Sequence, residues 1–508
     1  MVVCLVVEIS QLFLKIINKT HNPLKTNQYD IIIIGAGSAG MCCAIRAAER
    51  GRKILVLEKD TVVGGTLHLT AGHMSAGGTR RQREKGIEDS PENHFEEVMK
   101  ISHQTAIPEI VKLATDLAPK TLDWLDDLGF GFAPETPAII YGHAPYAIPR
   151  THWGVSDYAG GDIKTTGISI FNTLKPVWDA LVSEGKITIL LEHKLTNLVK
   201  VEDQVVGVKA LHDGKESIFH GINTVLTTGG YASNAEFFKK VTPNTPRLLS
   251  SARLTSTGEG IMVAQTIGAK FRGAEMHNST LGGIELEPNS GRTDFWRNWA
   301  RVSNSVDRKP REIYVNEQAE RFIDEDTPNP DDREHIVNQQ SNRRFWLIFD
   351  EKALTAGPCI IPQYTHEQVR QEAQNEKAIW QADSIEELAN KIGLGTEKLT
   401  ETVNRYNAFC EEGKDKDFGR ILNNSESVYP LKNAPFYAIL TYAYSLISFG
   451  GLAINDKLEV LNENDEPIKG LYAAGEIIGV HATSGNAFCG GMVLTPALSF
   501  GKYLGETL

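Results

Sequence analysis

The chain has 508 residues, of which 41% are hydrophobic and 23% charged, with a formal net charge of −12. This length exceeds what one hydrophobic core usually serves, so we expect two or more domains. The acidic balance is spread along the chain and disfavours nucleic acid as a partner. No pair among the six cysteines has the C-x-x-C spacing of a metal site, which favours reduced thiols and a cytoplasmic location.

The first 27 residues form an extension with an apolar start. It lacks the basic residues and the cleavage site of a signal peptide, and it is too interrupted to cross a bilayer. Leu5, Ile9, Leu12 and Ile16 share one helical face. We therefore expect a helix that docks on the body of the protein or on another subunit, with a peripheral membrane contact as the alternative.

A strand–helix–strand unit comes next, in "IIIIGAGSAGMCCAIRAAERGRKILVLEKD". The apolar run Ile31–Ile34 predicts a buried strand. Helix-forming residues follow over Met41–Arg50, and Ile54–Leu57 predicts a second buried strand. This order is typical of a dinucleotide-binding βαβ unit.

The glycines between the first strand and the helix indicate the chemistry of this unit. Gly35, Gly37 and Gly40 form G-x-G-x-x-G, and Glu58 ends the second strand about 20 residues later. The first glycine permits a tight turn, the second admits a pyrophosphate, and the third lets helix and strand pack closely. The helix N-terminus stabilises the anion, and Glu58 is expected to accept hydrogen bonds from the adenosine ribose.

Further glycine-rich segments recur along the chain, at "GGTLHLTAGHMSAGGT", "TTGGYASN", "GLYAAGEIIG" and "CGGMVLTPALSFG". They place nucleotide-binding elements at both ends of the chain, around a middle segment that reads as an inserted mixed α/β domain. The predicted organisation is an extension at 1–27, a first nucleotide-binding part at 28–276, an inserted domain at 277–446 and a second nucleotide-binding part at 447–508.

Taken in this order, the motifs resemble the FAD-dependent fumarate reductase and 3-ketosteroid dehydrogenase superfamily. Two helical segments, "DSPENHFEEVMK" and "APKTLDWLDDLGFGFAP", and the element "IYVNEQAERFIDED" add to the likeness. The resemblance implies an α/β fold, with a Rossmann-like FAD-binding domain of the glutathione-reductase type and an inserted α+β capping domain.

The resemblance also implies FAD as the cofactor. In succinate dehydrogenase relatives, a histidine near the second glycine segment bonds covalently to the flavin, whereas Thr66 stands there in this chain. We therefore expect non-covalent FAD, although His68 and His73 lie nearby. The candidate FAD-binding residues are Gly35, Gly37, Ser38, Ala39, Gly40, Glu58, Lys59, Gly64, Gly65, Thr66, Thr228, Gly229, Gly230, Gly475, Glu476, Gly491, Val493 and Leu494.

Two carboxylate anchors of fumarate reductases are missing. Their histidine before a glycine pair is replaced in "LISFGG", and no arginine occurs between His481 and Lys502. His277, in "MHNST", matches part of their substrate-site element "HPT". Arg333 is the nearest match to their arginine proton donor, with an ion pair to Asp331 or Glu334 as the alternative reading.

Ketosteroid dehydrogenases use tyrosines to polarise a ketone and move a proton. In this chain "APFYAILTYAYSLISFGG" offers Tyr442 and Tyr444 as catalytic candidates, while Tyr437 is expected in the core. Half-buried packing is the alternative for the two candidates. Tyr141, His143 and Tyr314 are secondary candidates.

We therefore expect an FAD enzyme acting on a CH–CH bond next to a carbonyl in a hydrophobic ketone or enone, with an unknown electron acceptor. One alternative is a fumarate-reductase-like reductase of another unsaturated acid. Another is a flavin electron-transfer subunit, whose further redox centres would lie on another chain because haem and iron–sulfur motifs are absent from this sequence.

Overall fold

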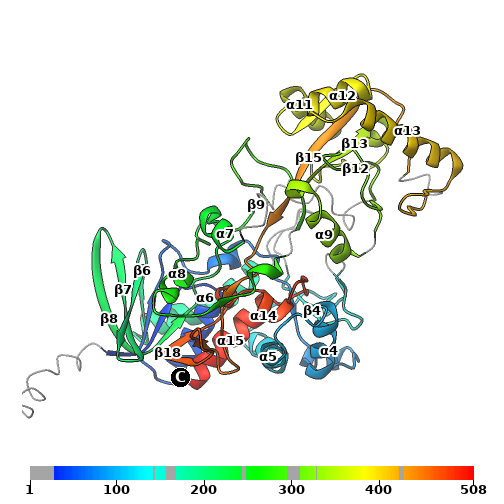
Figure 1. Ribbon diagram of the computed structural model, residues 1–508. Helices are drawn as coiled ribbons and strands as arrows, with labels where there is room; N and C mark the ends of the chain where they lie inside the picture. Colours follow the sequence, from blue (N-terminus) through cyan, green and yellow to red (C-terminus); the bar gives the residue numbers. More distant parts are fainter. Residues whose placement is uncertain are drawn as a thin grey trace, which may run out of the picture.

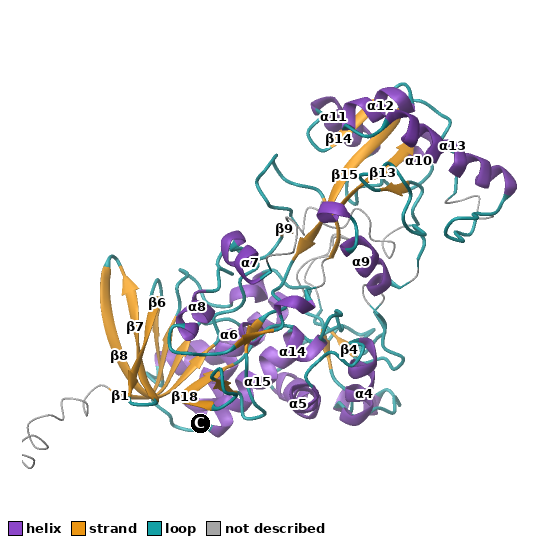
Figure 2. Cartoon of the chain, viewed as in Figure 1, coloured by secondary structure: helices purple, strands orange, loops and turns teal. Residues whose placement is uncertain are grey.

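The computed structural model describes residues 28–140, 144–155, 167–242, 248–277, 280–294, 309–327, 329–422 and 428–508. Within these ranges the chain forms two bodies, each with its own sheet and hydrophobic core (Figures 1 and 2). We call them the FAD body and the cap. The helix expected in residues 1–27 lies outside the described ranges.

The FAD body is built on an eight-stranded sheet with the order β17-β18-β7-β8-β1-β2-β5, in which β6 pairs with β7. The central strands β18, β8, β1, β2 and β5 run parallel, which places their carboxyl ends along one edge. The strands are β1 (Gln28–Ile34), β2 (Ile54–Leu57), β5 (Ile187–Leu190), β6 (Lys194–Val201), β7 (Gln204–His212), β8 (Lys215–Leu226), β17 (Glu459–Leu461) and β18 (Pro467–Ala473).

The predicted strand–helix–strand unit is present. Ile31–Ile34 is the buried part of β1, and Ile54–Leu57 is β2. Helix α2 (Ser38–Glu49) starts slightly earlier than the sequence pattern indicated, because Gly37 is its N-cap. The FAD-binding class of fold inferred from the sequence is thus confirmed.

The first and last parts of the sequence meet in the packing of α2 against α15 (Leu494–Thr507). A Cβ on Gly501 would lie 2.2 Å from the carbonyl oxygen of Ala39, and one on Gly505 would lie 2.4 Å from that of Cys43. Glycines at these two positions therefore let the helices touch along their backbones. The other helices of the FAD body are α3 (Arg80–Glu84), α4 (Pro91–Ile101), α5 (Pro108–Asp127), α6 (Gly167–Ser183), α7 (Ala235–Val241), α8 (Glu259–Gln265) and α14 (His481–Ser484).

The cap has a six-stranded sheet centred on the long strand β15, which runs toward the FAD body (Figure 1). β15 pairs antiparallel with β11, β13 and β14, and parallel with β9. The strands are β9 (Leu249–Ser250), β11 (Thr280–Gly283), β12 (Ile313–Val315), β13 (Arg344–Asp350), β14 (Ile379–Ala382) and β15 (Phe436–Ser445). The helices are α9 (Pro330–Asn338), α10 (Glu351–Thr355), α11 (His366–Asn375), α12 (Ile385–Ile392) and α13 (Thr396–Glu412).

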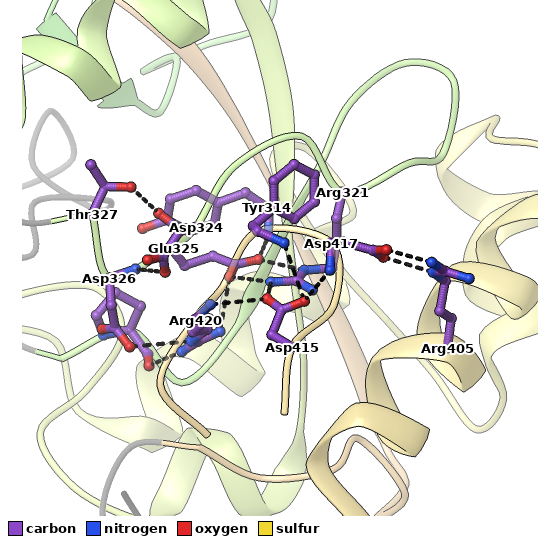
Figure 3. A network of polar contacts seen from close by, with 12 residues as sticks. Tyr314, Arg321, Asp324, Glu325, Asp326, Thr327, Arg405, Asp415, Asp417 and Arg420 are labelled. Atoms are coloured by element: carbon purple, nitrogen blue, oxygen red, sulfur yellow. Dashed lines mark hydrogen bonds and ion pairs between the residues drawn. The ribbon is translucent and has the colours of Figure 1, made fainter. Parts of the chain in front are cut away.

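A buried network of charges ties loops of the cap together (Figure 3). Glu325 accepts from Arg321 at 2.8 Å and from Arg420 at 3.1 Å, and its side chain is fully buried. Arg321 also pairs with Asp415, and Arg420 with Asp326. Buried charges of this kind are stable only when each is paired, so the network fixes the arrangement of these loops.

The chain contributes β9 to the cap sheet before the strands from β11 to β15 complete it. We keep the proposed boundaries at 277 and 446, although β9 pairs with the cap sheet from within the segment 28–276. Among the described residues, no helix is long and apolar enough to cross a lipid bilayer.

Candidate active site

The first glycine turn has the geometry of a phosphate cradle. A Cβ on Gly37 would meet no atom within 4 Å, so the backbone there is open to a ligand. A Cβ on Gly40 would lie 2.0 Å from the carbonyl oxygen of Gly35, which requires glycine for the close packing of helix on strand. Ser38 and Ala39 form the first turn of α2 directly beyond this opening.

Glu58 directly follows β2 and lies between the first and second glycine segments in the sequence. Its carboxylate accepts from the backbone N–H of Ala36 at 2.7 Å and from that of Asp60 at 2.8 Å. The next residue, Lys59, pairs with Glu259 at 2.7 Å. Glu58 is thus held at the edge where the sequence places the adenosine ribose, while Lys59 is engaged with the start of α8.

The second glycine segment lies against the first. The N–H of Gly64 donates to the carbonyl oxygen of Ala36 at 2.8 Å, and a Cβ on Gly65 would lie 3.1 Å from the Cα of Gly37. The neighbouring Thr66 is exposed. It stands where the resemblance places the flavin-linked histidine of succinate dehydrogenase relatives. His68, by contrast, donates to the carbonyl oxygen of Val63 at 2.9 Å.

The third glycine segment follows β8 and meets Glu476. A Cβ on Gly230 would lie 2.2 Å from Oε1 of Glu476, whereas Gly229 has only Ser256 Oγ at 4.0 Å. Thr228 is half-buried, and within the described part of the chain its Oγ1 has no hydrogen-bond partner. An orphaned hydroxyl at this edge is consistent with a missing ligand.

The C-terminal residues line a small surface hollow between 475–480 and 492–497. Glu476 accepts from the N–H of Ser448 at 2.8 Å, and burial raises the pKa of Glu476 to about 7. Gly475 and Val493 also line this hollow. A Cβ on Gly491 would lie 2.3 Å from Ser75 Oγ, so this last segment fits tightly against β3 (Met74–Ser75), which lies within the second glycine segment.

Two helices begin beside this hollow without a hydrogen bond from a capping side chain. α2 and α15, the latter starting at Leu494, have no side-chain cap and no acid in the first turn. Their helix dipoles and uncapped first turns therefore favour an anion or a carbonyl oxygen. Together with the open backbone at Gly37 and the orphaned hydroxyl of Thr228, they fit FAD, and the placement expected from the sequence puts the pyrophosphate at α2 and the flavin toward α15.

The candidate tyrosines lie at the end of β15 nearest the FAD body. Tyr444 is fully buried and pairs with Thr280 and Leu249 across the sheet. Tyr442, on the same face, is half-buried and stands opposite Arg344, whose raised pKa reflects contacts with Glu317 and the Tyr442 hydroxyl. Both tyrosines thus lie at the junction of the two bodies.

Tyr437, farther along the strand, is a core residue as expected. It is fully buried, stacks on Phe349, and donates from its hydroxyl to Glu351 at 2.7 Å. The secondary candidates Tyr141 and His143 lie outside the described residues.

His277 lies among aromatic side chains. Its ring is 5.1 Å from that of Phe238 and 5.5 Å from that of Phe449, edge to face in both cases. Burial, with a smaller contribution from Arg343, lowers the pKa of His277 to about 3. The imidazole is therefore neutral at pH 7 and brings no positive charge to a substrate.

Arg333 is buried on α9, with 1% of its surface exposed. Its Nη2 lies 3.5 Å from the hydroxyl of Tyr314, and its charge acts on the neighbouring Glu334. Asp331, the other suggested partner, contacts His103 and His335. Arg333 thus lies in the cap helix that meets the FAD body.

Two residues near this junction were missed by the sequence analysis. His481 donates from Nδ1 to the carbonyl oxygen of Phe449 at 2.8 Å, next to the position where fumarate reductases carry a histidine. Arg343 lies near His277 and precedes β13 in a left-handed conformation (φ 47°). No sequence motif marked either residue. His481 is an isolated histidine, and Arg343 is one of two adjacent arginines.

Comparison with known proteins defines the class. The family model described as "FAD binding domain" matches residues 30–493. The chain therefore belongs to this family, and it is an FAD-dependent oxidoreductase of the fumarate reductase and ketosteroid dehydrogenase group, as the sequence resemblance implied.

Particular relatives cover nearly all of the chain. It is 29% identical to "Probable fumarate reductase Ifc3" of Shewanella frigidimarina, over 95% of this chain and 75% of that relative. It is 26% identical to "Vinyl phenol reductase" of Lactiplantibacillus plantarum, over 89% of this chain and 90% of that one. The fold matches that of 3-ketosteroid delta1-dehydrogenase from Sterolibacterium denitrificans, with a TM-score of 0.75 at 21% identity, covering 94% and 99% of the two chains.

Proposed function

We propose that this flavoprotein acts on a carbon–carbon bond next to a carbonyl in a largely apolar ketone or enone. The observation that carries the proposal is the packing of His277 edge to face against the rings of Phe238 and Phe449. A dicarboxylate needs fixed positive charges when it leaves water. Around His277 the chain offers aromatic surface, with Phe449 where the reductases have their histidine, and the charge of Arg343 acts on this ring.

The protein residues have separate tasks in this proposal. Bound FAD supplies hydride transfer, whereas the protein supplies binding, orientation and the proton. Tyr442 and Tyr444 are proposed to polarise the carbonyl oxygen and to carry the proton at the carbon next to the one that exchanges hydride. The aromatic side chains around His277 exclude water from the apolar part of the substrate.

Two of the comparisons bear on direction and substrate. The relatives in Shewanella and Lactiplantibacillus are both called reductases, which favours reduction of a double bond. A vinyl phenol has no carboxylate, so its reductase supports the idea that this architecture serves substrates without acid groups. The likeness to the ketosteroid enzyme concerns the fold alone.

The test uses the FAD-loaded protein, reduced anaerobically and mixed with candidate oxidants. Enones such as 2-cyclohexenone and a 4-en-3-one steroid should reoxidise it faster than fumarate does. Tyr442→Phe and Tyr444→Phe should each slow this reoxidation by about 10²–10⁴-fold. Tyr437→Phe, on the same strand but in the core, is the matched control and should retain the rate. Faster reoxidation by fumarate than by every enone would refute the proposal.

A second candidate is the reduction of an unsaturated monocarboxylic acid. It is favoured by two buried or half-buried cations in the cap, Arg333 and Arg343. In this proposal Arg343 would bind the carboxylate of the substrate, and Arg333 would donate the proton. Reoxidation by acrylate should then exceed that by enones and should be lost in Arg333→Gln, while Tyr314→Phe, which removes only the hydroxyl beside it, should retain most of it.

A further inference from the structure

We propose that His103, Asp331 and His335 bind a divalent transition-metal ion that joins the cap to the FAD body. This set, which we call the bridging triad, is the one group of potential metal ligands found among the described residues. None of its three side chains is among the candidate FAD-binding or catalytic residues, although Arg333 lies on the same helix. Its three ligand atoms all lie within 4.8 Å of one another.

The triad draws its ligands from both bodies. His103 follows α4 in the FAD body, while Asp331 and His335 are one turn apart on α9 of the cap. Residues four apart share a helix face, so the second pair points to the same side. α9 lies on the side of the cap that faces α4 and the short strand β4 (Thr151–His152) (Figure 1). An ion held here would bridge two parts of the chain that are 228 residues apart.

The geometry suits a small cation. Nε2 of His103 lies 3.0 Å from Oδ2 of Asp331, and Nε2 of His335 lies 3.5 Å from the same oxygen. Ligands about 2.0–2.1 Å from a tetrahedral zinc ion are separated from each other by about 3.4 Å. The two measured distances lie on either side of this value, so modest side-chain rotation would complete the site.

Exposure and charge favour binding as well. The Asp331 side chain is only 4% exposed, whereas those of His103 and His335 are 54% and 35% exposed. A buried anionic ligand is thus combined with two histidines open to solvent, which leaves an entry path and a position for water. Asp332, beside the triad, acts electrostatically on His335 and adds negative potential.

The local backbone holds the ligands in place. Asn329 caps α9 by accepting from the N–H of Asp331 at 3.1 Å. His103 and Gln104 both have left-handed backbone conformations, with φ of 53° and 61°, directly after α4. Consecutive left-handed residues are costly unless the surroundings support them. This turn directs the His103 ring toward α9, where Nε2 of His103 forms a hydrogen bond with Asp331.

The occupant is a borderline metal ion rather than calcium or magnesium. Imidazole nitrogens suit zinc, copper and nickel, whereas calcium and magnesium prefer oxygen ligands. The ligand set of two histidines and one carboxylate leaves at least one coordination position open. Because the ligands come from both bodies, metal binding should restrain the motion of the cap.

The test titrates the FAD-loaded, tag-free protein with ZnCl₂ in a buffer that does not bind metals, followed by calorimetry. We expect one zinc per chain with a dissociation constant in the micromolar range or below. His103→Gln and Asp331→Asn should each weaken binding by about 100-fold or abolish it. His366→Gln is the matched control, since that histidine lies elsewhere in the cap and bonds the carbonyl oxygen of Gly357 at 3.0 Å.

Two readouts are independent of enzyme activity. Cu²⁺ bound in place of zinc should show electron paramagnetic resonance couplings to two imidazole nitrogens, reduced to one in His335→Gln. Zinc should also slow amide hydrogen exchange in α9 and in residues 102–105. Absence of stoichiometric binding, or binding that survives His103→Gln combined with His335→Gln, would overturn the proposal and leave the triad as hydrogen-bonded side chains.

Discussion

Glu476 is a buried carboxyl group among the candidate FAD-binding residues. Burial raises its pKa to about 7, so in the apoprotein it holds a proton that the unfolded chain has already released above its ordinary pKa of 4.5. The folded apoprotein therefore binds more protons than the unfolded chain between about pH 4.5 and 7, and its stability falls as pH rises through this window.

This argument predicts the behaviour of Glu476→Gln. Relative to Glu476→Gln, the melting temperature of the wild-type apoprotein should fall between pH 5 and pH 7.5, because no charge has to form at this position in the variant. Differential scanning fluorimetry at several pH values measures this. Glu463→Gln, at an exposed turn, is the control and should follow the wild type. Identical pH profiles for wild type and Glu476→Gln would contradict the argument.

Glu325 is a second residue with a predictable effect, because it is the shared acceptor of two buried arginines. Glu325→Gln leaves Arg321 and Arg420 short of a partner and should lower the free energy of unfolding by about 3–5 kcal/mol. Urea denaturation is the measurement. The pair Arg405–Asp417, drawn in the same view (Figure 3), has an Arg405 side chain that is 57% exposed. Arg405→Gln should therefore cost less than about 1 kcal/mol.

At the scale of elements, Gly37 at the start of α2 is expected to matter for FAD binding but not for folding. Gly37 has an ordinary backbone conformation (φ −79°) and open space where a Cβ would lie. Gly37→Val should therefore leave the melting temperature of the apoprotein within about 2 °C of the wild type, because the apoprotein has nothing for the side chain to strike.

The same change should exclude the cofactor, because the valine side chain fills the volume that the pyrophosphate needs. We expect the FAD dissociation constant to rise on the order of 100-fold, measured by flavin fluorescence quenching. Gly131→Ala is the control, since a Cβ there also meets no atom within 4 Å. Tight FAD binding by Gly37→Val would place the pyrophosphate elsewhere.

The elements differ in how far the sequence could predict them. β1, α2 and β2 were predictable because glycine spacing and buried runs are local properties. The pairing of Arg344 with Tyr442 depends on the register of β13 against β15, and the bond from His481 to Phe449 joins residues 32 apart. Such contacts depend on how the chain folds back, so the residue types were visible in the sequence but their neighbours were not.

At the scale of the whole molecule, two cores imply two units of unfolding. The core of the FAD body contains residues from both ends of the chain, and the cap core contains residues from Ile284 to Ala443. All the candidate FAD-binding residues lie in the FAD body. A ligand that binds only the folded state of one unit stabilises that unit by mass action, so FAD should act on the two units unequally.

Calorimetry of the apoprotein should therefore show two overlapping transitions. FAD at 100 times its dissociation constant should stabilise one unit by about 2.7 kcal/mol. The midpoint temperature of that unit's transition should therefore rise. Glu325→Gln should lower the midpoint of the other, because its network lies wholly within the cap. If both changes move a single transition together, the two bodies unfold as one unit. In that case the contacts across their junction contribute more to stability than two separate cores imply, and the cap could not move over the flavin without loss of structure.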